Sequence, residues 1–390
     1  MAVTIDDFHV EPLLALARER SGVAGLDDRD LIDPLTRVLA SYRAEAGFPE
    51  RGVQAMHMHL LDLLTMRIRI LDTIRKHPEI LQEQIKAPVI ILGLPRTGST
   101  KLQRVLSATG EFQSLPLWRI FNPLPLPTDK PGEDSRIAYA EQLVAGMKQF
   151  FPRFYAGHPM VATEPDEEAL LLEMTFDTDA PCWLARVPSY QAWLLGHNNE
   201  WSYRWLKNVL QLLQWQDERA SPARPWVLKS PVHIGRLDEI FAVFPDAIIV
   251  NCHRDLNSSV PSGAALLEAM WGLYADNVDA HQAGRVVMDL LTHSMQNYVD
   301  ARGRWEAKGK TFVDVRFADV VGDMDAVAAK VFAKRGIAFT DKTSQSMKRW
   351  EAANPPFKHG EFAYDLARYG LSAEQIKTTF KDYLAKYAAA

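Results

Sequence analysis

A short apolar run that leads directly into a glycine-containing turn constrains the fold of this chain more than any other sequence feature. Residues 88–92 read PVIIL, residues 93–100 read GLPRTGST, and residues 101–107 have the pattern of a helix. A continuous apolar run rich in β-branched residues is typical of a strand that is buried on both faces of a parallel sheet. The sequence therefore predicts a strand, a loop and a helix in immediate succession, with a ligand site at the loop.

Three more segments have the character of buried strands. They are residues 226–228, residues 247–250, which follow a turn-like Phe-Pro-Asp, and residues 311–315. Strands separated by helical patterns favour a parallel sheet with helices on both faces, and such sheets bind ligands at the carboxyl ends of the strands. We therefore predict an α/β fold with a P-loop-type parallel sheet flanked by helices, and expect functional residues directly after Leu92, Leu228 and Val250.

The rest of the chain is predicted to be largely helical. Residues 9–85 repeat apolar positions at helical spacing, which predicts a helical N-terminal section over residues 1–86. The following section, residues 87–390, contains a segment at about 111–225 with six of the ten tryptophans, and this segment is too long for a simple crossover. We expect a large helical insertion after the first βα unit, forming a wall over the edge of the sheet, and expect both sections to form one compact unit.

Charge and cysteine content argue against several kinds of partner and site. The chain has 44 Lys and Arg against 49 Asp and Glu, a formal net charge of -5, so it lacks the overall positive field that holds nucleic acid or an anionic membrane. Its two cysteines, Cys182 and Cys252, are too few for a disulfide framework or a clustered zinc site. The N-terminus lacks the pattern of a secretion signal, and no segment approaches the roughly 18 to 20 apolar residues of a membrane span. We expect a cytoplasmic protein without a nucleic-acid partner, a membrane span or a metal.

The glycine-containing loop comes close to the phosphate-binding pattern GxxxxGK[ST]. Its glycines allow a tight turn, and the backbone N–H groups together with the N-terminus of the next helix can hold a phosphate. Ser99 stands where an ATPase has its lysine, and a cation lies instead in the middle of the loop, at Arg96. The later strand ends carry Lys229 and Arg254 rather than a metal-holding aspartate. This pattern favours a donor that is handled without magnesium.

A second anion-binding pattern follows the third strand, and it carries a family resemblance. Arg254 comes directly after this strand and Ser262 follows eight residues later. The two residues resemble the 3′-phosphate-binding element of sulfotransferases that use 3′-phosphoadenosine 5′-phosphosulfate (PAPS), and residues 93–100 resemble their 5′-phosphosulfate loop. The chain is similar in particular to the bacterial sulfotransferases with an HRDP-type motif. The resemblance covers roughly residues 88–385 through LKSPVH at 228–233, FPDA at 244–247, HRD at 253–255 and HG at 359–360.

The resemblance implies that PAPS is the co-substrate and that the enzyme transfers its sulfuryl group to a hydroxyl group. The residues that it assigns to donor binding are Pro95, Arg96, Thr97, Gly98, Ser99, Thr100, Arg254, Ser262, His359 and Gly360. Arg96 is expected to stabilise the charge that develops on the bridging oxygen, and Lys229 to contact the transferred group. His233 is a candidate general base, because imidazole can accept a proton at neutral pH. Glu168, within the acidic run at 164–168, competes with it.

Each of these assignments has a structural alternative. Lys229 could form only a salt bridge, His233 could cap or pack a helix, and the acidic run could serve the dipole of the following helix. Two residues depart from the family pattern: Arg119 follows Trp118 where relatives commonly carry glutamate, and Leu256 replaces the proline of the HRDP-type motif. The first departure leaves the identity of the base open.

The predicted acceptor is a small, largely apolar molecule such as an alcohol, a phenol or a lipid-like metabolite. The insertion, which we expect to form the acceptor side, supplies aromatic side chains for an apolar pocket: Trp118, Phe121, Phe150, Phe151, Phe154, Tyr155, Trp183, Tyr190 and Trp193. An ATP-dependent small-molecule kinase is the alternative function, and a non-catalytic nucleotide-binding module is another. The N-terminal helices could cover the mouth of the acceptor site or form the surface of a homodimer, and the sequence does not decide between them.

Overall fold

The fold is built around one parallel sheet. The computed structural model describes the chain except residues 1–2, 25–27, 131, 218–223, 356–364 and 388–390. The described strands are β1 (Val89–Gly93), β2 (Val227–Lys229), β3 (Ile248–His253) and β4 (Val313–Arg316). They form a four-stranded sheet in the order β2-β1-β3-β4, and every neighbouring pair is parallel. The α/β prediction and the four predicted strand positions are therefore confirmed, with small shifts at the strand ends.

Burial of both faces explains why the strand segments are continuous apolar runs. Every residue of β1 and β3 is buried. Along β1, Ile90 and Leu92 belong to one hydrophobic core, while Val89 and Ile91 belong to a second core on the opposite face. Because neighbouring side chains of a strand point to opposite faces, no position of this strand is left for a polar residue.

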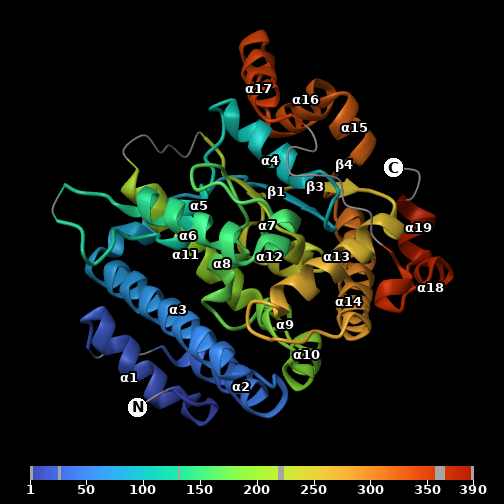
Figure 1. Ribbon diagram of the computed structural model, residues 1–390. Coiled ribbons are helices and arrows are strands. Elements are labelled where there is room, and N and C mark those ends of the chain that lie inside the picture. Colours follow the sequence, from blue (N-terminus) through green and yellow to red (C-terminus); the bar gives the residue numbers. More distant parts are fainter. Residues whose placement is uncertain (1–2, 25–27, 131, 218–223, 356–364, 388–390) are drawn as a thin grey trace.

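Helices cover both faces of the sheet (Figure 1). The smaller core, on one face, contains side chains from α4 (Ser99–Ala108) and α16 (Met324–Arg335). The larger core, on the other face, contains side chains from α11 (Glu200–Gln216), α12 (Leu237–Val243), α13 (Leu256–Trp271) and α14 (Ala280–Ala307). This arrangement is the predicted P-loop-type parallel sheet flanked by helices.

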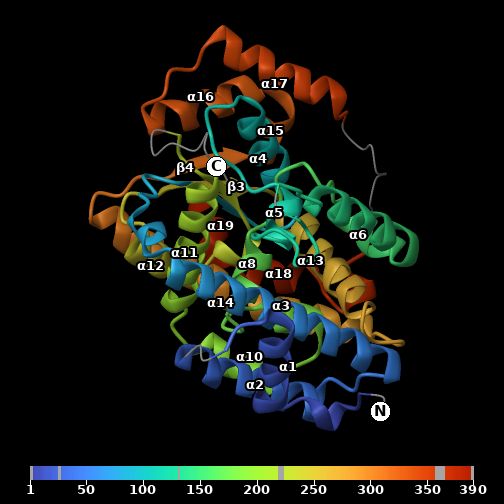
Figure 2. The same ribbon diagram turned by 90° about the vertical axis from the view of Figure 1, so that its left-hand side faces the viewer.

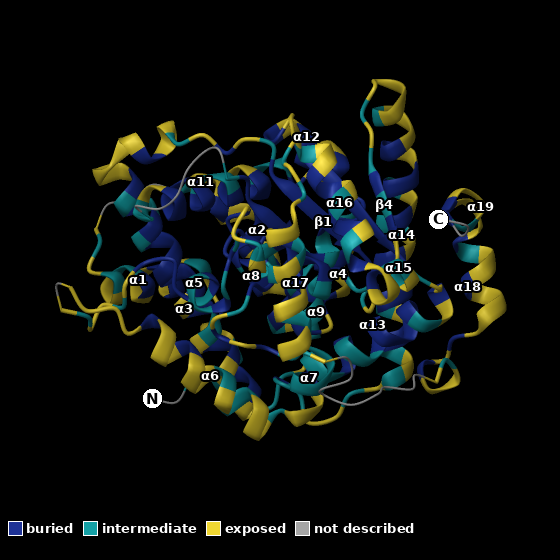
Figure 3. Cartoon of the chain, turned by 90° about the horizontal axis from the view of Figure 1, so that it is seen from above, coloured by how far each residue is buried: buried dark blue, intermediate teal, exposed yellow. Residues whose placement is uncertain are grey.

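The N-terminal section is helical, as predicted, and shares the larger core. It consists of η1 (Ile5–Asp7), α1 (Val10–Ser21), α2 (Arg29–Glu45), α3 (Glu50–Lys76) and η2 (Pro78–Gln82). Figure 2 shows α1, α2 and α3 as a layer at one end of the molecule. Buried residues from Phe8 to Ile249 fall in one contiguous cluster, and Figure 3 shows buried residues running through the helices and the sheet alike. The hydrophobic core is thus continuous from these helices to β3.

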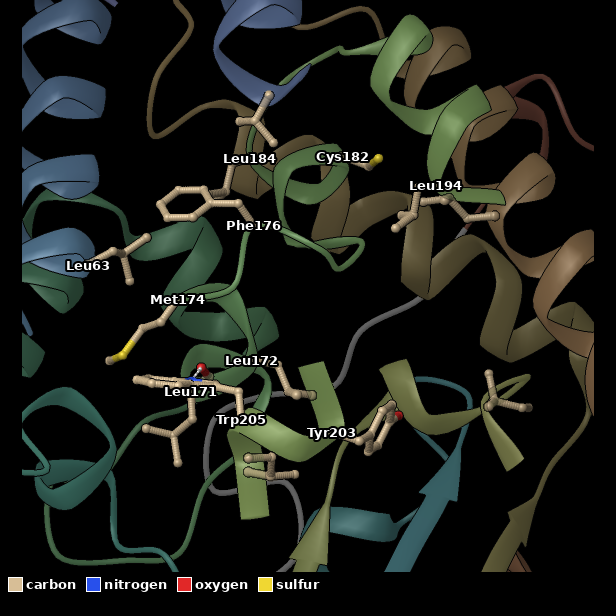
Figure 4. Close-up of a cluster of buried hydrophobic side chains, with 14 of the residues drawn as sticks. Leu63, Leu171, Leu172, Met174, Phe176, Cys182, Leu184, Leu194, Tyr203 and Trp205 are labelled. Carbon is tan, nitrogen blue, oxygen red and sulfur yellow. Dashed lines mark hydrogen bonds between the residues drawn. The ribbon is translucent and has the colours of Figure 1, made fainter. Parts of the chain in front are cut away.

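The predicted insertion is a set of mostly short helices. Before α11 it contains α5 (Leu117–Phe121), α6 (Arg136–Phe150), α7 (Pro152–Gly157), α8 (Ala169–Glu173), α9 (Ala180–Leu184) and α10 (Pro188–Leu195). Figure 4 shows how side chains from α3, α8, α9, α10 and α11 meet in the core, among them Leu63, Leu172 and Tyr203. The insertion therefore connects the N-terminal helices to the elements that surround the sheet.

The C-terminal part completes the cover of the sheet. Its elements are α15 (Phe317–Gly322), α17 (Asp341–Ala353), η4 (Ala367–Tyr369), α18 (Ala373–Thr379) and α19 (Lys381–Tyr387), and the short η3 (Pro231–His233) follows β2. α19 packs against α14. Among the helices that the structure describes, none has the length and apolar character needed to cross a membrane.

Candidate active site

The loop between β1 and α4 has a conformation that requires its two glycines. Gly93 has φ 151° and Gly98 has φ 84°, which are values that residues with a Cβ rarely adopt. A Cβ on Gly93 would lie 2.6 Å from the carbonyl oxygen of Cys252, and a Cβ on Gly98 would lie 2.9 Å from Cγ1 of Val320. The Thr97 hydroxyl closes the turn by donating to the Leu94 carbonyl oxygen at 2.8 Å. A closed turn of this kind at a helix N-terminus is suited to bind a phosphate group.

Arg96 occupies the middle of this loop and contacts the segment after β3, which the sequence predicts to be a second anion-binding element. It is exposed, and its φ of 69° is left-handed although it is not glycine. Nη1 of Arg254 donates to the Arg96 carbonyl oxygen at 2.7 Å. The loop after β1 and the segment after β3 are therefore directly bonded to each other.

Arg254 lies between the end of β3 and the start of α13, as the sequence predicts. Its guanidinium carbon is 3.9 Å from the centroid of the Phe317 ring, and Phe317 is the first residue after β4. Asp255 caps α13 by accepting from the backbone N–H of Asn257. Ser262 lies in the second turn of α13 and is buried. Leu256, which replaces the motif's proline, begins α13 and packs into the larger core.

Two adjacent glutamates of the insertion meet the end of β2. Nζ of Lys229 lies 2.6 Å from Oε1 of Glu167, and the backbone N–H of Lys229 donates to Oε2 of Glu168 at 3.0 Å. The Lys229 side chain is only 1% exposed, whereas the Glu167 side chain is 21% exposed. The lysine ammonium is thus neutralised from one side by a carboxylate that still reaches solvent.

Glu168 also takes part in a second set of hydrogen bonds, which is fully buried. Its Oε1 is hydrogen-bonded to Nε2 of His233, and Nδ1 of His233 lies 2.9 Å from the Tyr203 hydroxyl. Burial raises the pKa of Tyr203 well above its ordinary value, so this phenol keeps its proton. The side chains of Glu168 and His233 are both 0% exposed. Both nitrogens of His233 and both oxygens of Glu168 therefore have partners inside the protein.

The segment that carries these glutamates is anchored by the preceding aspartate. Asp166 Oδ1 lies 3.0 Å from Nε2 of His158, and its Oδ2 lies 3.6 Å from Nη2 of Arg104. Burial alone would raise the pKa of Asp166, but the charges of His158, Lys229 and Arg104 together hold it well below its usual range. Burial also disfavours the charged form of His158, and the Asp166 carboxylate outweighs this and raises its pKa. The pair thus shifts both pKa values in the direction that favours the charged forms.

Other residues that the sequence singles out lie elsewhere. Nη2 of Arg119 donates to the Leu213 carbonyl oxygen at 2.7 Å, and its Nη1 lies 3.8 Å from Asp217. Burial lowers the pKa of Arg119 to about 10. The departure from the family pattern at this position therefore places a cation at the end of α11. His359 and Gly360 lie outside the described residues, and the residues that the structure does describe contain no cluster of three or more His, Cys, Asp or Glu placed to hold a metal.

Sequence reasoning did not single out three residues of this region. Glu167 lies within the acidic run, but sequence spacing does not show which of its carboxylates reaches Lys229. Tyr203 is 30 residues from His233, so no local pattern links the two. For Phe317, the only sequence signal is its position directly after a strand. Sequence reasoning did place Arg96, Lys229 and Arg254 at the carboxyl ends of three adjacent strands, where the structure has them.

Comparisons with known proteins agree with this architecture. The model of the sulfotransferase family matches residues 88–341. The crystal structure of the sulfotransferase STF1 from Mycobacterium tuberculosis is 28% identical and has a TM-score of 0.77, with 97% of this chain and 98% of that chain covered. The sulfotransferase STF9 from Mycobacterium avium, 24% identical over 97% of both chains, has the same fold at a TM-score of 0.86. A search of curated proteins found no match. Because the family model matches more than half of the chain, the chain belongs to the sulfotransferase family.

Proposed function

We propose that this enzyme transfers the sulfuryl group of PAPS to a hydroxyl group of a small, largely apolar acceptor. The observation that carries the proposal is the hydrogen bond from Arg254 to the Arg96 carbonyl oxygen. It joins a loop suited to a 5′-phosphosulfate to an arginine suited to a 3′-phosphate. Lys229 stands at the end of the neighbouring strand β2. The donor that fits three cations on adjacent strand ends is a nucleotide with anionic groups on both its 5′ and its 3′ side.

The proposed chemistry uses these groups as fixed charges. The acceptor oxygen attacks the sulfur of the donor, and the bond between this sulfur and the bridging oxygen breaks. Negative charge then develops on the bridging oxygen, which stays with the leaving 3′-phosphoadenosine 5′-phosphate (PAP). Arg96 and the backbone N–H groups at the start of α4 stabilise that charge. The Lys229 ammonium is buried beside Glu167 and acts on the transferred group through its charge rather than through the predicted contact. The proton of the acceptor hydroxyl passes to a base.

The geometry favours Glu167 as this base. A general base must come within hydrogen-bond reach of the acceptor hydroxyl. Glu167 keeps part of its side chain exposed, whereas the sequence-based candidates Glu168 and His233 are fully buried and have partners at both of their polar atoms. In this proposal Glu168 and His233 hold the backbone of Lys229 and the acidic segment in place.

Apolar side chains of the insertion support the proposed class of acceptor. Leu117, Phe154 and Met160 form a separate buried cluster, on which partly exposed Phe121, Phe151 and Tyr155 pack. This cluster lies next to the acidic segment, because the backbone N–H of Leu117 donates to the Glu164 carbonyl oxygen at 3.0 Å. An acceptor with an apolar body and one hydroxyl group fits such surroundings.

Calorimetric titration with PAP in the presence of EDTA tests the proposed donor. We expect the wild-type protein to bind PAP without metal, and expect Arg254→Ala to weaken binding by about tenfold or more, the scale of one charge-assisted hydrogen bond. AMP, which lacks the 3′-phosphate, serves as the control ligand, and its affinity is expected to change little. Binding of ATP with magnesium in the absence of any binding of PAP would overturn the proposal and favour the kinase alternative.

A further inference from the structure

A largely buried polar network joins β3 to β4 next to Arg254. His253, the last residue of β3, is 4% exposed. Its Nε2 lies 2.8 Å from Oδ1 of Asp314 on β4, and its Nδ1 lies 2.6 Å from the hydroxyl of Tyr383 on α19. Each nitrogen of the ring therefore has a partner from a different element. The mechanism proposed above assigns no role to His253, Asp314 or Tyr383.

The same network extends into the helices that cover this part of the sheet. Arg302 on α14 makes two hydrogen bonds of 2.7 Å to the two carboxylate oxygens of Asp314. Although burial would raise the pKa of Asp314, its bonds to Arg302 and His253 lower it well below its usual range. Tyr387 on α19 stacks on His253 with 5.6 Å between the ring centroids. A half-buried carboxylate with this many charged and polar partners holds them in one arrangement.

The network lies one residue from the site that we assign to the 3′-phosphate. His253 pairs with Arg316 at the ends of β3 and β4. Arg254 directly follows β3, and Phe317 directly follows β4. These two residues contact each other, since the Arg254 guanidinium lies over the Phe317 ring. A shift of His253 relative to Asp314 would therefore displace the guanidinium from both Phe317 and the Arg96 carbonyl oxygen.

We propose that His253 is a positioning residue for Arg254, and that α19, through Tyr383, takes part in the recognition of the donor's 3′-phosphate. The inference rests on the proposed function. His253 and Tyr383 need not touch the nucleotide. They fix the end of β3 so that the guanidinium keeps the orientation that a charge-assisted contact with a phosphate requires.

The test compares PAP with AMP, which differ only in the 3′-phosphate. The variants are Tyr383→Phe, which keeps the ring and removes one hydroxyl, and His253→Gln. We expect each variant to bind PAP roughly three- to tenfold more weakly, the scale of one lost hydrogen bond, and to bind AMP within about twofold of the wild-type affinity. Tyr190→Phe is the matched control, because Tyr190 is also buried and hydrogen-bonded but lies on α10; its ratio of PAP to AMP affinity should stay unchanged.

A double-mutant cycle shows whether the effect passes through Arg254. In the Arg254→Ala background, Tyr383→Phe is expected to change PAP affinity by less than about twofold, because the group that it positions is gone. Equal losses for PAP and AMP, an unchanged ratio in both single variants, or a full effect in the Arg254→Ala background would each overturn the inference. A wild-type protein that binds AMP as tightly as PAP would instead overturn the proposed donor. If the His253→Gln protein does not fold, the ratio of PAP to AMP affinity in Tyr383→Phe still tests the inference.

Discussion

Two neighbouring glutamates of the same segment have different surroundings. Glu167 pairs with the Lys229 ammonium and keeps access to solvent, whereas Glu168 is fully enclosed and bonds to His233 and to the backbone of Lys229. A carboxylate that exchanges protons with a bound molecule must reach it, and one that holds a strand end in place must not move. In the proposed mechanism, these two tasks fall to adjacent residues.

Replacement of each glutamate by glutamine separates these tasks. Glu167→Gln removes the proposed proton acceptor and is expected to lower kcat about 10²- to 10⁴-fold. It also leaves the buried Lys229 ammonium without its carboxylate, so the thermal unfolding midpoint is expected to fall as well. Glu168→Gln removes a buried charge that accepts two hydrogen bonds and is expected to lower the free energy of unfolding by about 1.5–3 kcal/mol. The measurements are steady-state turnover with a hydrophobic alcohol or phenol from an acceptor screen, and urea unfolding. A stable Glu168→Gln protein without turnover, beside an active Glu167→Gln protein, would identify Glu168 as the base.

At the scale of elements, an ion pair ties the end of α7 to the segment that leads into α8. His158 is the C-cap residue of α7, and its ring bonds to Asp166, which precedes the two glutamates. Because the pKa of His158 is raised and that of Asp166 is lowered, the stability that each group contributes is lost in a different pH range. The contribution of Asp166 is present above its unfolded pKa of about 3.9 and is lost on acidification. The contribution of His158 is full below its unfolded pKa of about 6.5 and is lost as pH rises through its raised folded pKa.

The ion pair between His158 and Asp166 should make stability depend on pH, and His158→Gln should remove part of that dependence. We expect the free energy of unfolding of the wild-type protein to decrease from pH 6 to pH 9 by more than that of His158→Gln, since the variant has no imidazole to lose its proton. Urea unfolding at both pH values measures the difference. The pKa of His59 is also raised, because the charge of Glu173 outweighs the effect of burial. His59 is present in both proteins, so its contribution to the pH dependence cancels when the two are compared. Equal slopes for the two proteins would show that the pair adds nothing to stability in this range.

For the whole molecule, the sequence predicted the features that depend on local pattern. The strands were predictable because burial on both faces requires continuous apolar runs, and the loop was predictable because Gly93 and Gly98 stand between a strand and a helix. Contacts between segments that are distant in the sequence could not be predicted, because no local pattern encodes them. Lys229 meets Glu167 across 62 positions and His253 meets Asp314 across 61. The proposed roles of these residues in the reaction stay predictions.

The continuous core predicts that the N-terminal helices unfold together with the sheet. Tryptophan fluorescence reports only on residues from Trp118 onwards, since the ten tryptophans all lie there, whereas far-UV circular dichroism also reports on α1, α2 and α3. We expect the two signals to give coincident urea transitions, because both regions share one core. A circular dichroism transition that begins at lower urea than the fluorescence transition would show that the N-terminal section unfolds separately.

The left-handed backbone at Arg96 has a consequence for protein engineering. A residue with a side chain held in this conformation destabilises the folded state by roughly 1–2 kcal/mol relative to glycine. The loop holds Arg96 in it, and Arg96 is the residue that the proposed mechanism assigns to the leaving group. Substitutions selected only for thermal resistance should therefore favour glycine at position 96. On the proposed role of Arg96, the Arg96→Gly protein is expected to be more stable and to have a lower kcat, so stability and turnover change in opposite directions at this position.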